Sequence, residues 1–502
     1  MRLKGKILLG GIIALSSIQL KAQSFAETAL LFSRTTPGGS ARIQSLGGSQ
    51  ISLGGDYSSA LSNPAGLGMY NKSEFVLTPA LNIAPSSSLH MGEKTNDSKT
   101  TFYIPGLAAS FHGDYKNLSG FLGGTFTIAF NRTNDFNRNI KYQGTNPNNS
   151  IIDAFIEDSN GFSINQFSAG GALFNTPTEL AFNNYLIGDS TVVDPAADPT
   201  QYFTDVLGIP FQTEEISTRK AQNQWSLSYG VNYNDRLFIG AGLGITSIKF
   251  ISTKIYTEDF VGEPLFDLRL EENLEIRGTG INGTFGAIYR PVDVFQFGFS
   301  ATTPTHFEMT DTYSATMSTN WDNFQYDPST LLNSVQALTD IVISEYSYNT
   351  QWKLNAGATF FLNKKGFISL DAERVDYSKA NYKSVTSGIS FNEDNDEIKS
   401  LYRTVYNIRA GAEYRHGGLS YRAGYAFMPD PFISEQNDIS RKITKFSAGI
   451  GYRTANYYVD FAAIYGIGQS SYRPYTVNSI NSPLVESDLS NINILITVGL
   501  PF

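Results

Sequence analysis

The sequence of 502 residues predicts an all-β protein, a closed antiparallel barrel of about fourteen strands that crosses a membrane. Three observations predict it: segments that alternate with a period of two recur along the chain, short and long connections take turns between them, and the last strand ends at an aromatic residue. In that last strand, one face carries Ile492, Ile494, Ile496, Val498, Leu500 and Phe502. This alternation is typical of a strand that turns its apolar face to lipid.

The amino-terminus has the layout of a secretory signal peptide. Arg2, Lys4 and Lys6 precede an apolar run that is too short for a transmembrane helix, and Ala22 offers a small residue for cleavage near Gln23. Residues 1–23 are therefore expected to be removed, which takes four bases away and shifts the formal charge from −9 to −13. An acidic balance argues against nucleic-acid binding. The chain has no cysteine, so disulfides and thiolate chemistry are excluded.

A barrel explains how a membrane protein has a mean hydropathy of only −0.18. No segment after the leader approaches eighteen consecutive apolar residues, which excludes a helical membrane protein, whereas a barrel places its apolar residues at alternate positions. Clean examples run over residues 225–233, 352–360 and 406–414, with aromatic residues at both ends of the apolar face. Such ends predict two interfacial girdles. The expected location is the bacterial outer membrane.

Connections between the expected strands alternate in length, as periplasmic turns and extracellular loops do in outer-membrane barrels. Short turns are expected near residues 112–117, 234–236, 290–292, 363–366, 415–418 and 453–456. Long connections are expected near residues 85–99, 132–222, 252–273, 303–348, 378–401, 429–440 and 468–486. The strands therefore start at about Lys72 and the barrel occupies residues 72–502.

Two regions lack the strand period. The connection over residues 132–222 is too long for an ordinary loop, so we expect a folded extracellular cap or lid, or a partly mobile segment. The mature residues before the first strand, 24–71, are rich in glycine with scattered apolar residues. We expect them to fold back into the barrel as a hatch that plugs the lumen.

The segment GGSQISLGGDYSSALSNPAGLGMY, residues 47–70, resembles the amino-terminal hatch of the long-chain fatty-acid transporter (FadL) family, with the motif Asn63-Pro64-Ala65-Gly66 at its centre. YRPVDVFQFGFSATTPTHFEMTDTYSA (289–315) and NIRAGAEYRHGGLSYRAGYAFMPDPF (407–432) look like the same family. The resemblance implies a monomeric fourteen-stranded barrel that takes up long-chain fatty acids or other hydrophobic small molecules passively.

The resemblance also implies that the substrate leaves sideways through a gap in the wall beside a kinked third strand. In this chain that strand reads SGFLGGTFTIAF, so Gly123 and Gly124 are the candidates for the lateral opening. The alternative is that the two glycines relieve crowding against the hatch. The family resemblance also covers relatives that serve as structural or shuttle components of protein-secretion machinery, which would give this chain a protein partner.

Charged residues fall on the lumen side of their strands by alternation, and we expect most of them to pair with each other and with the hatch. They are Lys353, Asp371, Glu373, Arg409, Glu413, Arg422, Lys445 and Asp460. The alternative for Arg409 or Arg422 is to hold a substrate carboxylate, since a guanidinium offers two parallel donors.

Enzymatic and metal chemistry have little support in the sequence. Residues 278–283 match G-x-G-x-x-G, but an alternating strand follows where the dinucleotide motif requires a helix. The four histidines are scattered and no nucleophile-and-base motif occurs, so we expect no catalytic residue, no metal and no cofactor. Residues 392–397 are acidic, and the alternatives for them are a calcium-binding loop or a solvated loop tip.

Overall fold

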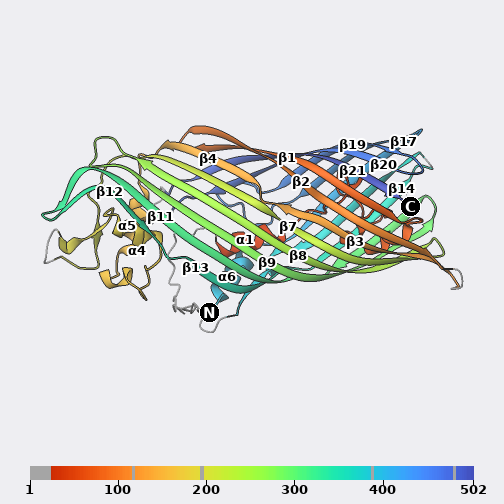
Figure 1. Ribbon diagram of the computed structural model, residues 1–502, viewed down its shortest axis with the longest axis horizontal. Coiled ribbons are helices and arrows are strands. Elements are labelled where there is room, and N and C mark those ends of the chain that lie inside the picture. The colour runs from red at the N-terminus through yellow and green to blue at the C-terminus, as the bar shows by residue number, and fades with distance from the viewer. Residues whose placement is uncertain (1–23, 116–118, 193–196, 364, 386–388, 479–481) are drawn as a thin grey trace, which may run out of the picture.

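The computed structural model describes residues 24–115, 119–192, 197–363, 365–385, 389–478 and 482–502, and the predicted signal peptide lies outside them. The chain forms a closed antiparallel barrel of fourteen strands, which confirms the predicted fold class (Figure 1). The strands of the first half are β1 (Glu74–His90), β2 (Glu93–Asp114), β3 (Phe121–Asp135), β4 (Arg138–Thr145), β7 (Phe211–Tyr233), β8 (Leu237–Asp259), β9 (Leu265–Val292), β10 (Phe295–Thr302) and β11 (His306–Asp327). Those of the second half are β12 (Thr330–Leu338), β13 (Val342–Asn349), β14 (Lys353–Phe361), β15 (Gly366–Asp376), β16 (Asn381–Ser384), β17 (Thr404–His416), β18 (Leu419–Met428), β19 (Ile443–Arg453), β20 (Tyr458–Tyr472) and β21 (Val485–Pro501).

Several strands of the wall are built from two pieces. β3 continues into β4, β10 into β11, β13 into β14 and β15 into β16, while β12 folds back on β11 as a hairpin. β1 pairs with β21, so the first and last strands close the barrel. The last residue takes part in this closure, because the Phe502 backbone N–H donates to the Ser73 carbonyl and the Phe502 ring stacks on Phe75 at 4.9 Å.

The outward face of the wall carries a continuous apolar band. On β7, for example, Trp225, Leu227, Tyr229 and Tyr233 are exposed, while Ser226 and Ser228 between them are buried in the lumen. Exposed large hydrophobic residues recur in this way on β1, β2, β8, β14, β17, β20 and β21. Such a band with aromatic ends matches the hydrocarbon core of a bilayer. No helix among the described residues is long and apolar enough to cross a membrane.

Several connections that we expected to be long loops are instead continued strands. β1 and β2 run on to a tight turn at Met91 and Gly92, so residues 85–99 form a hairpin. Residues 252–273 belong mostly to β8 and β9, and residues 303–348 mostly to β11, β12 and β13. These extensions rise beyond the apolar band, where both faces of a strand meet water or protein, so their sequence shows no period of two. The predicted short turns all join consecutive strands at the opposite end.

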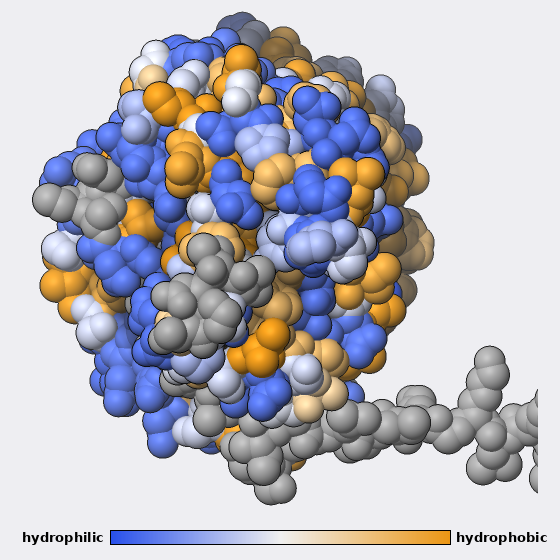
Figure 2. Space-filling model, turned by 90° about the vertical axis from the view of Figure 1, so that its left-hand side faces the viewer, coloured by the Kyte–Doolittle hydropathy of each residue, from blue (hydrophilic) through white to orange (hydrophobic). Residues whose placement is uncertain are grey.

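The stretch 132–222 divides in the same way. Its ends belong to β3, β4 and β7, and residues 146–210 form a cap with its own hydrophobic core. The cap contains α4 (Ile151–Ser159), η2 (Ile164–Phe167), α5 (Pro177–Asn183), β5 (Gly188–Asp189), η3 (Ser190–Val192) and β6 (Tyr202–Phe203). Its core includes Phe155, Leu180 and Leu186 and packs on the far ends of β8, β9 and β11. Seen from this end, polar and apolar residues are mixed over the surface (Figure 2).

A buried carboxylate fixes the start of the cap. The Ser150 hydroxyl and the backbone N–H of Ile151 both donate to Glu258 of β8, so the first turn of α4 is held on the barrel rim. At the other end of α4, burial raises the pKa of Asp158 to about 6, although the Thr178 hydroxyl donates to its carboxylate. The cap is therefore a packed unit with a carboxyl group that titrates just below neutral pH.

Residues 24–71, which we call the inner segment, lie inside the barrel (Figure 1). The inner segment contains α1 (Phe25–Ser33), α2 (Ala41–Ser45), α3 (Ser59–Ser62) and η1 (Pro64–Met69). α1 begins where the Ser24 hydroxyl accepts the Glu27 N–H, and α2 begins where Ser40 accepts from Ile43. Two further elements, η4 (Tyr377–Lys379) and α6 (Asn392–Leu401), lie between β15 and β17. The acidic residues 392–397 thus open a helix and are not a loop.

The wall is glycine-rich where the inner segment touches it. At Gly286 an added Cβ would collide with the Asn63 side chain, and at Gly298 with the backbone of Ile51. Equivalent close approaches occur at Gly230, Gly240, Gly411 and Gly424. These glycines let backbone approach backbone, which a side chain would prevent. They therefore explain why so many inward positions of the strands are glycine.

Candidate functional site

An apolar chamber surrounds α1 in the lumen, on the cap side of the inner segment. The Phe25 ring lies 5.6 Å from Tyr346, 5.1 Å from Tyr382 and 5.0 Å from Phe391, centroid to centroid. The other end of α1 places Phe32 at 5.8 Å from Phe136. The chamber is completed by Phe250, Ile276, Phe307, Met309, Tyr348, Tyr402 and Phe432, all of them buried.

Hydroxyl groups in the chamber hold α1 by its backbone. The Tyr348 hydroxyl donates to the Ala29 carbonyl at 2.7 Å, and the Tyr402 hydroxyl donates to the Ala26 carbonyl at 2.9 Å. At the end of the helix, the Arg34 guanidinium donates to the carbonyl of Arg441 at 2.8 Å. α1 thus occupies a site whose walls are aromatic and whose polar groups are mainly hydroxyl donors.

Below the chamber lies a small polar cavity of about 80 Å³. Its lining includes Thr36, Gln50, Asn282 and Gln351, together with many threonines of the wall. Both amide atoms of Gln50 and of Gln351 are buried without a hydrogen-bond partner among the described residues. Water is the natural partner for such groups, so the lumen changes from apolar to polar on the way to the periplasmic end.

We call the part of the inner segment from α2 to η1 its polar half. The motif Asn63-Pro64-Ala65-Gly66 lies in this half and is buried. The Asn63 side chain accepts from the Ala65 N–H at 3.2 Å and donates to the Ile51 carbonyl at 2.6 Å, so it caps η1 and ties two loops together. Gly66 packs so closely on Gly54 that neither has room for a side chain. The motif is therefore a compact turn, and Gly66 is required for its close packing and not for a left-handed conformation.

Carboxylates and hydroxyls of the wall bind the backbone of this polar half. Asp371 of β15 accepts from the Gln50 N–H at 2.6 Å and from the Ile51 N–H at 2.9 Å. Thr497 of β21 accepts from the Ala41 N–H at 2.7 Å, and Ser228 of β7 donates to the Ala60 carbonyl at 2.7 Å. The wall therefore holds this half at several points around its circumference.

The two arginines named as carboxylate binders are both engaged in ion pairs. Arg409 donates to Glu373 at 3.1 Å. Arg422 donates to Glu413 at 2.6 Å and also to Asp460, while Arg42 of the inner segment lies 3.7 Å from Glu413. Most of the lumen charges thus pair with each other or with the inner segment. Arg409 lines the polar cavity below the chamber together with its partner Glu373.

The wall has a gap between β2 and β3. β2 pairs with β1 from Glu93 to Ser110, but with β3 only from Gly106 to Asp114. Beyond the pair Gly106–Asn131, β3 pairs with β7 alone and carries a bulge between Arg132 and Asn134. β4 then runs along the inner face of β1, where the Ser86 hydroxyl donates to the Asn139 carbonyl at 2.8 Å. Over residues 93–105, the edge of β2 that faces β3 is therefore not paired with any strand, whereas the opposite edge pairs with β1.

The rim of this gap, which we call the β2–β3 gap, is apolar on its outer side and polar on its inner side. Phe102 and Ile104 are 71% and 45% exposed on the membrane face of β2. Inside, the Arg132 guanidinium lies 4.3 Å from the centroid of the Tyr103 ring, and Lys99 donates to the Thr218 carbonyl at 2.8 Å. Long side chains thus bridge the gap where backbone hydrogen bonds are missing.

The β2–β3 gap does not lie at the residues that the sequence pointed to. Gly123 pairs with Asp114 and Asn232, and Gly124 pairs with Gly113 and Val231, so both glycines are bridged on both sides, although β3 has a bulge against β7 between Phe121 and Gly123. An added Cβ at Gly124 would collide with the Tyr229 hydroxyl. The glycines therefore relieve crowding at the periplasmic end, against His112 and the Gly113 carbonyl at Gly123 and against two tyrosines at Gly124, and not against the inner segment.

Residues 278–283 lie within β9. The described residues contain no cluster of three histidine or acidic side chains placed to hold a metal ion. The chamber tyrosines escaped the sequence analysis because β13 lay inside an expected loop. The alternation of Tyr346 and Tyr348 was the signal that could have found them.

No protein-family model matches the chain, and no curated protein sequence matches it. Solved structures do match it, among them the following two. A FadL homologue from Pseudomonas aeruginosa superposes with a TM-score of 0.53 at 13% identity, over 93% of this chain and 99% of that one. The toluene transporter TodX from Pseudomonas putida superposes with a TM-score of 0.50 at 11% identity, over 93% and 99%.

A closed fourteen-stranded barrel with an outward apolar band is an outer-membrane β-barrel protein. More particularly, its fold is that of the FadL-like transporters, which confirms the fold that the sequence resemblance implied. At these identities the likeness concerns the fold.

Proposed function

We propose that this protein carries hydrophobic small molecules passively across the outer membrane, with the apolar chamber as the binding site and the β2–β3 gap as the exit into the membrane. One observation supports the proposal above all others. The chamber and the gap meet at the junction of β3 and β4, because Phe136 belongs to the chamber and follows directly after the bulge of β3. An apolar molecule in the chamber is therefore next to the opening.

Burial energetics favour this sideways route. An apolar molecule loses roughly 0.8 kcal/mol for each CH₂ group that it exposes to water. The way towards the periplasm leads through the polar cavity and then through the tightly held half of the inner segment. The way through the gap leads past Phe102 and Ile104 into hydrocarbon. An apolar substrate therefore meets its lower barrier at the wall.

α1 acts as the gate in this proposal. The Thr36 N–H donates to the Thr133 carbonyl at 2.9 Å, and Asn134 donates to the Leu31 carbonyl at 2.8 Å. The end of α1 is thus tied to the bulge that borders the gap. A molecule that displaces α1 from the chamber breaks these ties and frees the bulge, which couples binding to exit.

The chemistry of the chamber favours hydrophobic compounds without an obligatory carboxylate. Its walls are aromatic and its hydroxyls donate, whereas Arg409 and Arg422 are already paired with carboxylates elsewhere. Neutral aromatic or aliphatic molecules therefore fit it best. The solved neighbours are similar in fold to this chain, and one of them is a toluene transporter. The alternative role in protein secretion has no observation of its own among the described residues and is not proposed.

Bridging the β2–β3 gap tests the proposal, and the absence of cysteine in the chain makes the experiment clean. Tyr103→Cys with Arg132→Cys places one thiol on each side of the gap, and a short bis-methanethiosulfonate then links them by forming a disulfide with each thiol and releasing methanesulfinate. We expect the linked protein to stay folded in the outer membrane and to lose uptake of a hydrophobic compound such as toluene, while binding of the compound persists.

The matched control places the link where the same two strands are already paired. Ser110→Cys with Thr127→Cys replaces a pair of hydroxyls joined by a hydrogen bond of 2.9 Å, so a link there leaves the gap unchanged. Uptake should then equal that of the unlinked protein. Undiminished uptake after the gap has been linked would refute the lateral exit, and absence of any uptake by the unlinked protein would refute the transport function itself.

A further inference from the structure

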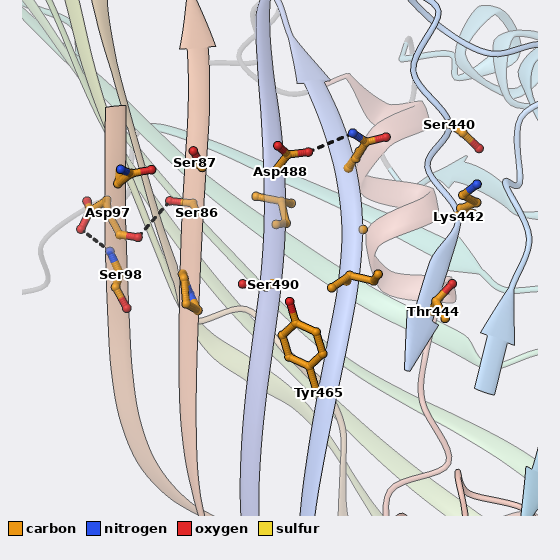
Figure 3. A pocket seen from close by; sticks show the side chains of 16 residues that line it. Ser86, Ser87, Asp97, Ser98, Ser440, Lys442, Thr444, Tyr465, Asp488 and Ser490 are labelled. Carbon is orange, nitrogen blue, oxygen red and sulfur yellow. Dashed lines mark hydrogen bonds between the residues drawn. The ribbon is translucent and has the colours of Figure 1, made fainter. Parts of the chain in front are cut away.

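A groove of about 930 Å³ lies on the outer face of the wall, beside the β2–β3 gap, whose β2 residues Asn96 and Ser98 form one end of it (Figure 3). It crosses five strands, from β2 over β1, β21 and β20 to the start of β19. Opposite residues on paired strands share a face, so Ser87, Asp488 and Gln469 all point outward into it. A groove of this size holds a ligand of many atoms and not a single ion.

The groove follows an interruption of the seam that closes the barrel. β1 and β21 pair at Ile83–Ile492 and again at Ser86–Leu489 without a change of register, but the residues between these pairs are not bridged. Pro85 lies at this point and has no N–H to donate. From the lumen side, the Arg138 guanidinium donates to the Pro85 carbonyl at 3.0 Å and to the Ser490 carbonyl at 3.1 Å. Arg138 thus fixes the backbone of both strands beneath the groove.

The groove lies at the border of the apolar band that is nearer to the cap. On β21 the outward residues are apolar from Leu500 to Ile492 and become polar at Ser490 and Asp488. On β20 the same change occurs between Ile467 and Gln469. The groove therefore spans the level at which acyl chains end and lipid headgroups begin. Its ligand should combine both kinds of chemistry.

The polar part of the lining consists chiefly of hydroxyl and amide groups: Ser87, Asn96, Ser98, Ser440, Thr444, Gln469 and Ser490. The buried Ser87 hydroxyl has no hydrogen-bond partner among the described residues. Asp488 accepts from the Gln469 amide at 2.9 Å and keeps further acceptor capacity, and the exposed Tyr465 ring adds an apolar face. Lys442 at one edge is the only cation in the lining.

From this lining we infer that the groove binds a glycolipid of the outer leaflet, with its saccharide headgroup among the hydroxyl and amide groups and an acyl chain along Tyr465 and Ile467. Saccharide hydroxyls both donate and accept, as this lining requires, and a ring face packs on a tyrosine. A phosphate headgroup fits less well, because the carboxylate of Asp488 repels it and a strong phosphate site needs several cationic donors. The bound lipid would cover the interrupted seam.

The test uses the full-length protein in phosphatidylcholine nanodiscs that contain a minor fraction of either monoglucosyl diacylglycerol or phosphatidylethanolamine with the same acyl chains. Native mass spectrometry of the released protein counts the lipids that it retains. We expect retention of one glucosyl lipid, several-fold more often than phosphatidylethanolamine. Ser87→Trp with Ser490→Trp fills the groove and should reduce retention to background, whereas Ser247→Trp, on the exposed outer face of β8, should not.

A second double variant tests the inference if filling the groove prevents folding. Gln469→Leu with Asp488→Leu keeps the volume of the groove and removes its central polar pair, so glucosyl lipid retention should again fall to background. Equal retention of the two lipids by the unaltered protein, or unchanged retention in a folded variant, would overturn the inference. Uptake of toluene should be the same in all these variants, so the outcome is independent of the proposed transport function.

Discussion

The two halves of the inner segment are held in the lumen by different forces. α1 sits in an aromatic chamber, and apolar contacts and tyrosine hydroxyls hold it there. The remainder, from α2 to η1, lies against wall glycines and is bound by carboxylates and hydroxyls of several strands. Apolar contacts are non-directional and another apolar molecule can replace them, whereas the hydrogen bonds fix one position. From this difference we expect α1 to be the exchangeable half and the remainder to stay in place.

Removing both halves should have the largest effect. A barrel of fourteen strands is wider than the eight-stranded barrels whose interior side chains fill, so deletion of residues 24–71 should leave an aqueous channel. The barrel itself should still assemble, because its strands pair with each other. We expect single-channel recordings in planar bilayers to show ion conductance that the intact protein lacks. Recordings as silent as those of the intact protein would mean that the inner segment does not close the lumen.

The ion-pair cluster beneath α2 should show the second largest effect. Arg422→Ala leaves Glu413 and Asp460 buried, with Arg422 no longer between them, which costs about 3–5 kcal/mol in the free energy of unfolding. Arg415→Ala is the matched control, because Arg415 pairs with the same Glu413 from a half-exposed position and should cost less than about 1 kcal/mol. Urea titration of the heat-modifiable folded form measures both. Equal losses would show that burial does not distinguish the two pairs.

The sequence predicted the parts of the molecule that face lipid better than those that face protein. A strand such as β7 alternates over Trp225–Tyr233 because one face meets hydrocarbon, and the alternation is visible in the residues themselves. Beyond the apolar band the outer face no longer meets lipid, and the inner faces of β8 and β11 pack on the cap, so the pattern of a lipid-facing strand ends there and predicts loops. Hydrogen bonds to neighbouring strands determine that those segments are strands. The residues of one segment do not show which strands lie beside it.

Contacts between distant segments also explain why the sequence did not predict the position of the β2–β3 gap. Gly123 and Gly124 are the conspicuous glycines of the third strand, but the ladder opens at Gly106 and Asn131, where β3 turns inward to follow β7. At that turn the inner segment is bonded to Thr133 and Asn134, and the inner segment is distant in sequence. Conversely, the expectation that the lumen charges pair with each other needed only the alternation, and it agrees with the bonds of Arg409 and Arg422.

Removing α1 alone should separate the two halves. A protein that lacks residues 24–34 keeps the bonds of Asp371 and Thr497 to the remaining inner segment, so it should stay closed to ions. Its chamber should be open, and binding of an apolar fluorescent probe such as N-phenyl-1-naphthylamine should increase. The protein without residues 24–71 is the positive control for conductance. Ion conductance equal to that control would mean that α1 contributes to the closure, and unchanged probe binding would mean that the chamber is not a ligand site.

A single hydroxyl should have the smallest effect and give the sharpest comparison. Tyr348→Phe removes the hydrogen bond to the Ala29 carbonyl, and a bond of this kind contributes about 1 kcal/mol. If α1 leaves the chamber as a unit, its amides should exchange with deuterium about fivefold faster, which corresponds to that free energy. Tyr346→Phe is the matched control, because the Tyr346 hydroxyl donates to Asp311 of the wall at 2.8 Å and not to α1. Exchange over residues 25–33 should therefore accelerate in the first variant and not in the second. Exchange over residues 41–45 should change in neither, because α2 is held by Thr497 and by its own cap. Acceleration of both helices together would show that the inner segment opens as one body, and the distinction between its two halves would then fail.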